Sequence, residues 1–285
     1  MAVAEMTKRE KRKADLKQKW KNEKGLCIVY IVLRVIVVGV MIARLIDRDY
    51  NNVFLCLLTL VLFMIPSFME GKLKIGVPNV LEVIILIFIF AAEILGEIGE
   101  YFVNVPNWDV MLHTTTGFLA AAVGLSLVEL LNGSKRVSMK LSPLFVALVA
   151  FCFSMTIGVL WEFFEFGVDH LFNMDMQKDT VIHTIRSVAL HPEGKNIPVT
   201  IDNITSVVVN GKDLGLGGYL DIGLIDTMKD LFVNFIGAVV FSVFGFFHTK
   251  YGKKGKLVDN LLLTRIEDEN VDGSQEQPEQ MDEKE

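Results

Sequence analysis

Long apolar runs separated by short polar breaks dominate the chain. Six of them lie at residues 26–46, 53–69, 80–101, 110–131, 144–166 and 226–247. A helix needs about 20 such residues to cross the hydrocarbon core of a bilayer, so each run is long enough to span it. The breaks carry turn residues, for example Gly76 with Pro78, and Pro106. The pattern predicts an all-α fold, a polytopic membrane bundle of about six transmembrane helices.

Positive charges lie unevenly between these runs. Residues 1–24 hold nine Lys and Arg against four acids, whereas residues 257–285 hold ten acids against two bases. Short loops rich in Lys and Arg stay in the cytoplasm, and here such loops follow the second, fourth and sixth runs. We therefore expect a multi-pass protein of a bacterial plasma (inner) membrane with both termini cytoplasmic. Its expected parts are a basic tail (1–25), a transmembrane domain (26–249) and an acidic, disordered cytoplasmic tail (250–285).

The loop at 170–225 is too long to be a passive connection. Residues 176–190 fit a short amphipathic helix, while 197–201 and 206–209 are rich in β-branched residues. Asn210 and Gly211 follow them and form a pair typical of hairpin turns. We predict a small extracytoplasmic cap that contains a β-hairpin and covers the outer mouth of the bundle.

Ionisable residues inside the runs concentrate toward their outer ends. In the third run Glu93, Glu97 and Glu100 follow helical spacing. One further run begins with an acid and a histidine four residues apart, and another begins with two acids at the same spacing. Charged residues at membrane depth are costly, so they indicate a partner, a water-filled cavity or a function. The predicted outward-facing pocket contains Asp109, His113, Glu162, Glu165, Asp169, Asp226, Asp230 and Asn234.

Several functions fit such a pocket. One imidazole among carboxylates suits a divalent cation, with Asp109, His113, Glu162, Glu165, Asp226 and Asp230 as metal ligands. A metal-bound water, or a glutamate acting as base, would then attack a lipid-linked or cell-envelope substrate. In this hypothesis Glu162, Glu165 and His113 are catalytic, and Asp169 and Asn234 bind substrate.

Three other interpretations stay open. A cation or proton-coupled transporter would need polar residues below this cluster, where the sequence is apolar except for Glu82 near the inner interface and Arg34 in the first run. A non-catalytic scaffold or lipid-binding protein would use the pocket to hold helices or a head group together. In the third interpretation the acids are solvated at the interface or paired with Arg34, Arg44 and Lys229, and His113 is a structural histidine. The lipid bilayer is the expected partner, nothing indicates nucleic acid, and the oligomeric state, the metal and the substrate stay undetermined.

These residues also form motifs that resemble known families. Trp108-Asp109 with His113 and Gly117, then Trp161-Glu162 with Glu165, then Asp226, Asp230, Asn234 and Gly237 resemble the YjdF-like bacterial inner-membrane proteins. The resemblance covers roughly residues 108–247 and implies an uncharacterised membrane family. A remoter similarity to VanZ-like proteins, linked to glycopeptide antibiotic tolerance, implies shared architecture. This chain departs from that pattern at Glu165 and Val110 and in its longer outer loop.

Overall fold

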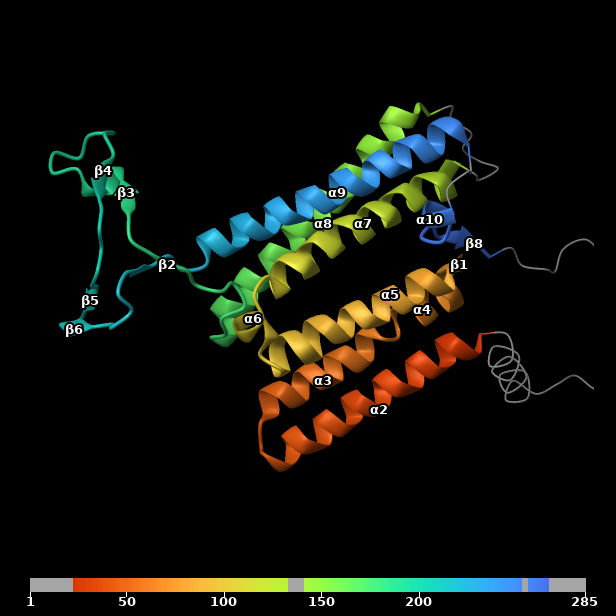
Figure 1. The fold of residues 1–285 in the computed structure, drawn as a ribbon, viewed down its shortest axis with the longest axis horizontal. Coiled ribbons are helices and arrows are strands. Elements are labelled where there is room, and N and C mark those ends of the chain that lie inside the picture. Colours follow the sequence, from red (N-terminus) through yellow and green to blue (C-terminus); the bar gives the residue numbers. More distant parts are fainter. Residues whose placement is uncertain (1–22, 133–140, 253–255, 267–285) are drawn as a thin grey trace, which may run out of the picture.

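Long helices, with one loop that projects from them, make up the structure (Figure 1). It is a computed structural model that describes residues 23–132, 141–252 and 256–266. Within these residues, five helical segments are long and apolar enough to cross a membrane: Lys24–Ile46, Tyr50–Leu73, Trp108–Asn132, Pro143–Phe172 and Leu224–Tyr251. The predicted third span is not among these five; it forms α5 (Asn79–Ile89) and the π-helix η2 (Phe90–Ile98), which lie alongside them. The prediction of an all-α membrane bundle is confirmed.

The helices form two groups that are separate in the view of Figure 1. The first bundle contains α2 (Lys24–Ile46), α3 (Tyr50–Leu62), α5 and η2; the second contains α7 (Trp108–Asn132), α8 (Pro143–Phe172) and α9 (Leu224–Tyr251). Within the first bundle, α4 (Ile65–Phe68), η1 (Met69–Leu73) and β1 (Ile75–Gly76) lie between α3 and α5. The short helix α6 (Tyr101–Asn104) leads from η2 to α7 in the second bundle. Each bundle has its own apolar core, and α5 contributes to both, with Leu86 in the first core and Leu81 in the second.

Small residues bring α7 and α9 very close together. A Cβ added to Gly117 on α7 would lie 2.1 Å from the backbone oxygen of Asn234 on α9. A Cβ added to Gly237 on α9 would lie 2.1 Å from the backbone oxygen of Thr114 on α7. Helices in membranes associate through such small-residue contacts because lipid supplies no hydrophobic driving force between them. These two glycines therefore place α7 and α9 in direct backbone contact.

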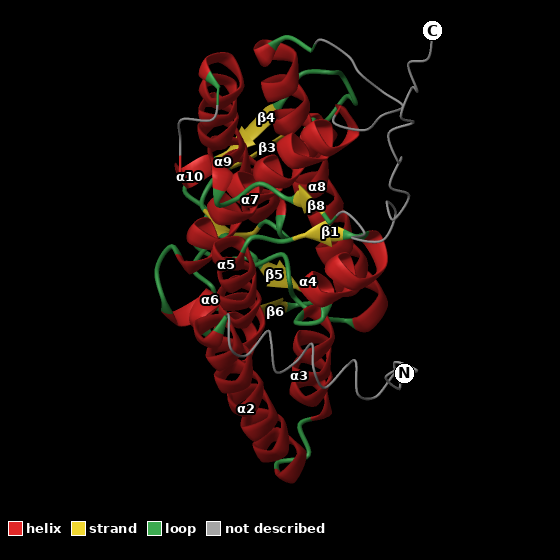
Figure 2. Ribbon diagram, turned by 90° about the vertical axis from the view of Figure 1, so that its right-hand side faces the viewer, coloured by secondary structure: helices red, strands yellow, loops and turns green. Residues whose placement is uncertain are grey.

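A segment of the predicted disordered tail is ordered. After α9, residues 256–266 form α10 (Lys256–Asp259) and β8 (Thr264–Arg265), and β8 pairs with β1 between the two bundles (Figure 2). Leu261, Leu262 and Leu263 are buried in the second core, and the backbone N–H of Leu263 donates to the Ser126 Oγ at 2.9 Å. The expectation of disorder from residue 250 is wrong over this stretch because three consecutive leucines supply apolar surface to bury. Residues 267–285, like residues 1–22 of the basic tail, lie outside the described part of the chain.

The long loop consists of short strands rather than a helix. They are β2 (Val181–Ile182), β3 (Ile185–Ser187), β4 (Val199–Ile201), β5 (Val208–Val209), β6 (Lys212–Asp213) and β7 (Tyr219–Leu220), with a 3₁₀ turn η3 (Val188–Leu190). The predicted hairpin is present, since β5 and β6 pair across Asn210 and Gly211, both at positive φ. The predicted helix at 176–190 is wrong. Most of the loop projects away from the helices, and only its first and last residues lie at the end of the second bundle (Figure 1).

Candidate metal centre

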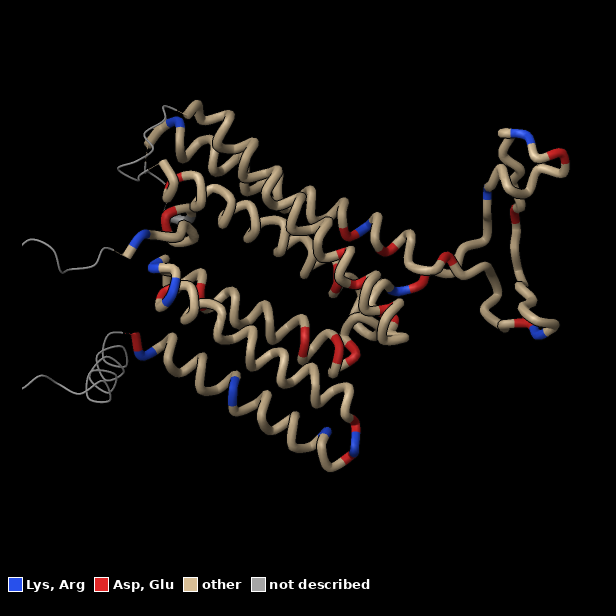
Figure 3. The backbone as a smooth tube through the Cα atoms, turned by 180° about the vertical axis from the view of Figure 1, so that it is seen from behind, with Lys and Arg blue, Asp and Glu red and all other residues tan. Residues whose placement is uncertain are grey.

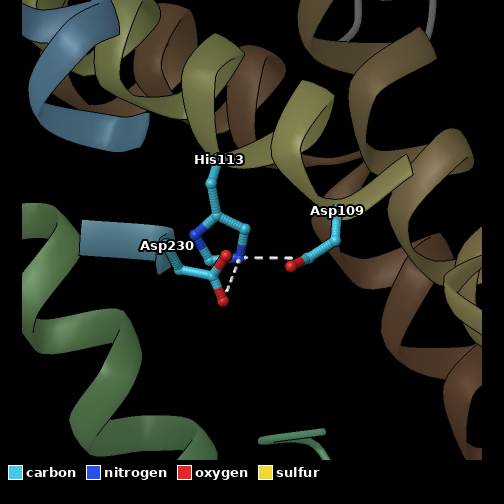
Figure 4. A group of neighbouring side chains, drawn as sticks. All are labelled: Asp109, His113 and Asp230. Carbon is cyan, nitrogen blue, oxygen red and sulfur yellow. Dashed lines mark ion pairs between the residues drawn. The ribbon is translucent and has the colours of Figure 1, made fainter. Parts of the chain in front are cut away.

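His113 lies among acids that come from all three helices of the second bundle. Its Nε2 is 3.4 Å from Asp109 Oδ1, one turn earlier on α7, and 3.7 Å from Asp230 Oδ2 on α9 (Figure 4). Its Nδ1 is 3.9 Å from Glu162 Oε1 on α8. Because α7 and α9 touch at their glycines, residues one turn beyond that contact are held at a short distance. The sequence predicted this convergence, and the structure brings these four residues together.

Two groups of side chains have the spacing of metal ligands. Asp109, His113 and Asp230 offer ligand atoms that all lie within 4.8 Å of one another, and so do Glu162, Glu165 and Asp230. Ligands about 2.1 Å from one ion lie roughly 3.0–3.5 Å apart when they are neighbours in its coordination shell. The separations of 3.4 and 3.7 Å around His113 are close to that spacing and are long for direct hydrogen bonds.

The acids of this centre are buried without enough partners. The side chains of Glu162 and Asp230 are 6% and 2% exposed, and Glu162 Oε2 and Asp230 Oδ1 have no hydrogen-bond partner among the described residues. The Trp161 indole donates from Nε1 to Glu165 Oε1 at 2.8 Å and fixes that carboxylate. No described lysine or arginine forms an ion pair with Glu162, Glu165 or Asp230. Clustered carboxylates in a low-dielectric site need a cation or shared protons, because they cannot all stay ionised otherwise.

Three other aspartates build the base of the loop instead. Asp169, at the end of α8, accepts from the backbone N–H of Met176 at 2.6 Å and of Gln177 at 3.0 Å. Asp226 accepts from the N–H of Lys178 at 2.8 Å. These carboxylates tie residues 176–178 to the ends of α8 and α9, and the residues that follow pair as strands in β2 and β3, so the predicted helix is absent. We call residues 174–180 and 219–223 the stem of the loop.

Asp221 completes the stem and was not singled out in the sequence. Its two oxygens accept from the N–H of Thr180 and the N–H of Ile225, both at 2.7 Å. It thereby joins the first strand-bearing half of the loop to the beginning of α9. Trp161 was likewise noted only as part of a motif, although its indole orients Glu165. The sequence offered one local sign of this role: Asp221 lies just before the start of a helix, where aspartate side chains often accept from backbone N–H groups.

Asn234 lies beneath the acids at the glycine contact. Its side chain is fully buried, its Nδ2 is 3.7 Å from the sulfur of Met155, and its Oδ1 has no partner within the described ranges. A Cβ on Gly158 would lie 2.6 Å from that Nδ2, so Asn234 fills the space between α8 and α9. Beside it, Ser154 donates to the backbone oxygen of Gly117 at 2.7 Å. Substrate binding by Asn234 stays a prediction.

The glutamates of the third run lie outside both ligand groups. Glu93 and Glu97 belong to η2 in the first bundle and are partly buried, and Glu100 is exposed just after it. Asp169 and Asp226 are also absent from the groups found among the described residues. Of the six predicted metal ligands the structure therefore gathers five, Asp109, His113, Glu162, Glu165 and Asp230, and gives Asp226 a hydrogen bond to the stem.

Fold and site together define a polytopic integral membrane protein with a buried acidic and histidine centre. A family model described as "Predicted membrane protein (DUF2238)" matches residues 26–251, and the chain belongs to that family. This agrees with the resemblance to an uncharacterised membrane family, and the remoter similarity to VanZ-like proteins stays a prediction. No curated protein and no solved structure matches the chain significantly.

Proposed function

We propose that the second bundle binds a divalent cation through Asp109, His113 and Asp230. The observation that carries this proposal is the arrangement around His113, with carboxylate oxygens of three helices at 3.4–3.9 Å. The buried Asp230 Oδ1 and Glu162 Oε2 without partners add to it, since a native protein rarely leaves such atoms unsatisfied. An imidazole with carboxylates suits Mn, Zn, Fe or Mg.

The ion would serve to recognise or hydrolyse a phosphorylated lipid or another lipid-linked cell-envelope substrate. Asp230 follows the start of α9 by six residues, so it lies about 9 Å below that helix end by the helical rise. This depth is close to the head-group region, and a divalent cation binds phosphate oxygens well. In a hydrolysis, the oxygen of the metal-bound water would bond to phosphorus as the bond to the leaving oxygen breaks. Glu162, Glu165 and His113 are the candidates to accept the proton that the water loses and to pass it to the leaving oxygen.

The centre would face the exterior of a bacterial plasma membrane. Both the beginning of α2 and the end of the described chain lie at the opposite end of the molecule (Figure 1). Lys72, Lys74 and Lys250 lie at that end as well, and positive loops favour the cytoplasm. Figure 3 shows the acids at the stem end and the nearly uncharged helix centres between the two ends.

Tight packing below the centre supports a binding or catalytic function over transport. Gly117, Gly158 and Asn234 close the space between the helices one to two turns beneath His113. A proton or cation crossing the membrane would have to pass this contact. Flux into liposomes that Glu162→Gln abolishes would favour the transporter instead.

Metal analysis of the purified full chain tests the proposal. The wild type should retain a divalent metal that His113→Ala removes, while His183→Ala in the projecting loop retains it. With Mn²⁺ present, a short-chain phosphatidic acid should raise the melting temperature of the wild type, and a short-chain diacylglycerol without phosphate should not. A wild type without metal above background would refute the ion site. If the variants change the stability of the protein but neither its metal content nor its response to phosphatidic acid, the result would favour the scaffold interpretation.

A further inference from the structure

Asp230 belongs to both groups of candidate ligands. Its Oδ2 faces the His113 ring at 3.7 Å, and its Oδ1 is buried without a hydrogen-bond partner in the described chain. The carboxylate also lies within 4.8 Å of ligand atoms of Glu162 and Glu165. A carboxylate that belongs to two ligand groups, with one oxygen buried and unpartnered, is suited to bridge two ions.

We propose that Asp230 bridges two divalent cations. The first ion is the one already proposed at Asp109 and His113, so this inference rests on the proposed function. The second ion is held by Glu162 and Glu165 of α8, with Asp230 as the shared ligand.

Charge supports the second position. Glu162, Glu165 and Asp230 are all buried, and no described lysine or arginine pairs with them. A single ion at His113 would leave the two glutamates of α8 with shared protons alone to offset their charge, and ionised carboxylates without a cation are strongly unfavourable in a site of low dielectric. A second divalent cation neutralises them.

Geometry supports it independently of charge. Glu162 and Glu165 are three residues apart on α8, so both project from one face toward α9. The Trp161 indole holds Glu165 Oε1 at 2.8 Å and leaves the second oxygen of that carboxylate for an ion. Glu162 directs Oε1 toward His113 and has a free, buried Oε2.

Two ions narrow the substrate class. Two metal ions roughly 3.5–4 Å apart, each bound to a different oxygen of a tetrahedral group, are typical of sites that bind or cleave phosphate esters. We infer that the ligand of this centre carries a phosphate or pyrophosphate, and that a ligand with only hydroxyl or amine groups does not bridge the pair.

Manganese titration with electron paramagnetic resonance tests the bridge. The purified full chain is stripped with chelator, loaded with Mn²⁺ and measured for bound metal and for its spectrum. We expect two Mn²⁺ per chain and the multiline signal of an exchange-coupled pair. Glu165→Gln should bind one Mn²⁺ with an isolated six-line signal, and Glu129→Gln, an acid at the other end of α7, should keep both ions.

The outcomes separate this inference from the proposed function. One ion per wild-type chain, lost in His113→Ala, would keep the proposed function and overturn the bridge. Two ions without exchange coupling would also overturn the bridge. No bound ion would overturn both. If Glu165→Gln does not fold, the stoichiometry and spectrum of the wild type still decide.

Discussion

The two helix bundles differ in what holds their helices together. The core of the first consists of large aliphatic side chains with Cys56 and Phe63, and Gly39 on α2 has nothing within 4 Å of an added Cβ. In the second, backbones meet at Gly117 and Gly237, and every residue of the candidate centre lies on α7, α8 or α9. The first bundle can therefore tolerate changes of side-chain shape better, whereas the second holds its polar groups in register through close backbone contact.

The largest effect is expected from filling the glycine contact. Gly117→Leu should prevent α7 and α9 from approaching, because its Cβ alone would meet the Asn234 backbone at 2.1 Å. Overpacking usually costs about 1–3 kcal/mol, and a backbone clash should exceed that range. Size-exclusion profiles in detergent should show loss of the folded peak for this variant. Gly39→Leu, in open space on α2, is the matched control, and an equal loss there would remove the contrast between the bundles.

The next effect concerns metal content. Asp230→Asn should reduce bound metal to background, since this residue belongs to both ligand groups. Glu93→Gln in η2 changes a partly buried acid of the first bundle and should leave metal content unchanged. Elemental analysis of both variants makes the comparison. A loss of metal in Glu93→Gln would mean that both bundles contribute to one centre.

A smaller, local effect should follow from Asp169→Asn. Replacing the carboxylate weakens two hydrogen bonds to the backbone at Met176 and Gln177, and a bond to a charged group contributes about 1.5–3 kcal/mol. Hydrogen exchange at residues 174–180 should become faster while metal content is retained. If hydrogen exchange at these residues is unchanged, the pairing of β2 with β7 is sufficient to order the stem without Asp169.

The smallest effect compares two hydroxyl groups. Ser154 donates between helices to the Gly117 oxygen, whereas Thr59 of α3 donates to Leu55 within its own helix. Ser154→Ala should cost about 0.6 kcal/mol, an average value for hydrogen bonds between membrane helices, and Thr59→Val should cost less. Denaturation by sodium dodecyl sulfate measures both. A larger loss for Thr59→Val would contradict the assignment of polar packing to the second bundle.

Helical spacing was sufficient to predict much of the centre. Asp109 with His113, and Glu162 with Glu165, are neighbours along their own helices, so periodicity places each pair on one face. The loop was harder to predict because its conformation depends on carboxylates distant in sequence. The backbone N–H of Lys178, for example, donates to Asp226, 48 residues away, and β2 pairs with β7, more than 35 residues further along the chain, where local propensity favoured a helix. The order of residues 256–266 likewise depends on Ser126 of α7 and on β1.

The sequence alone determined the membrane class, the positions of the long helices and the residue types at their ends. Hydropathy and the 3.6-residue period are local properties, so they are readable before the chain folds. Only the tertiary structure decided which acids lie close to one another, that Asp169 and Asp226 hold the stem, and that Asp230 belongs to two groups. These outcomes depend on how closely and at what register separate helices pack, and a single helix carries no information about its distance from its neighbours.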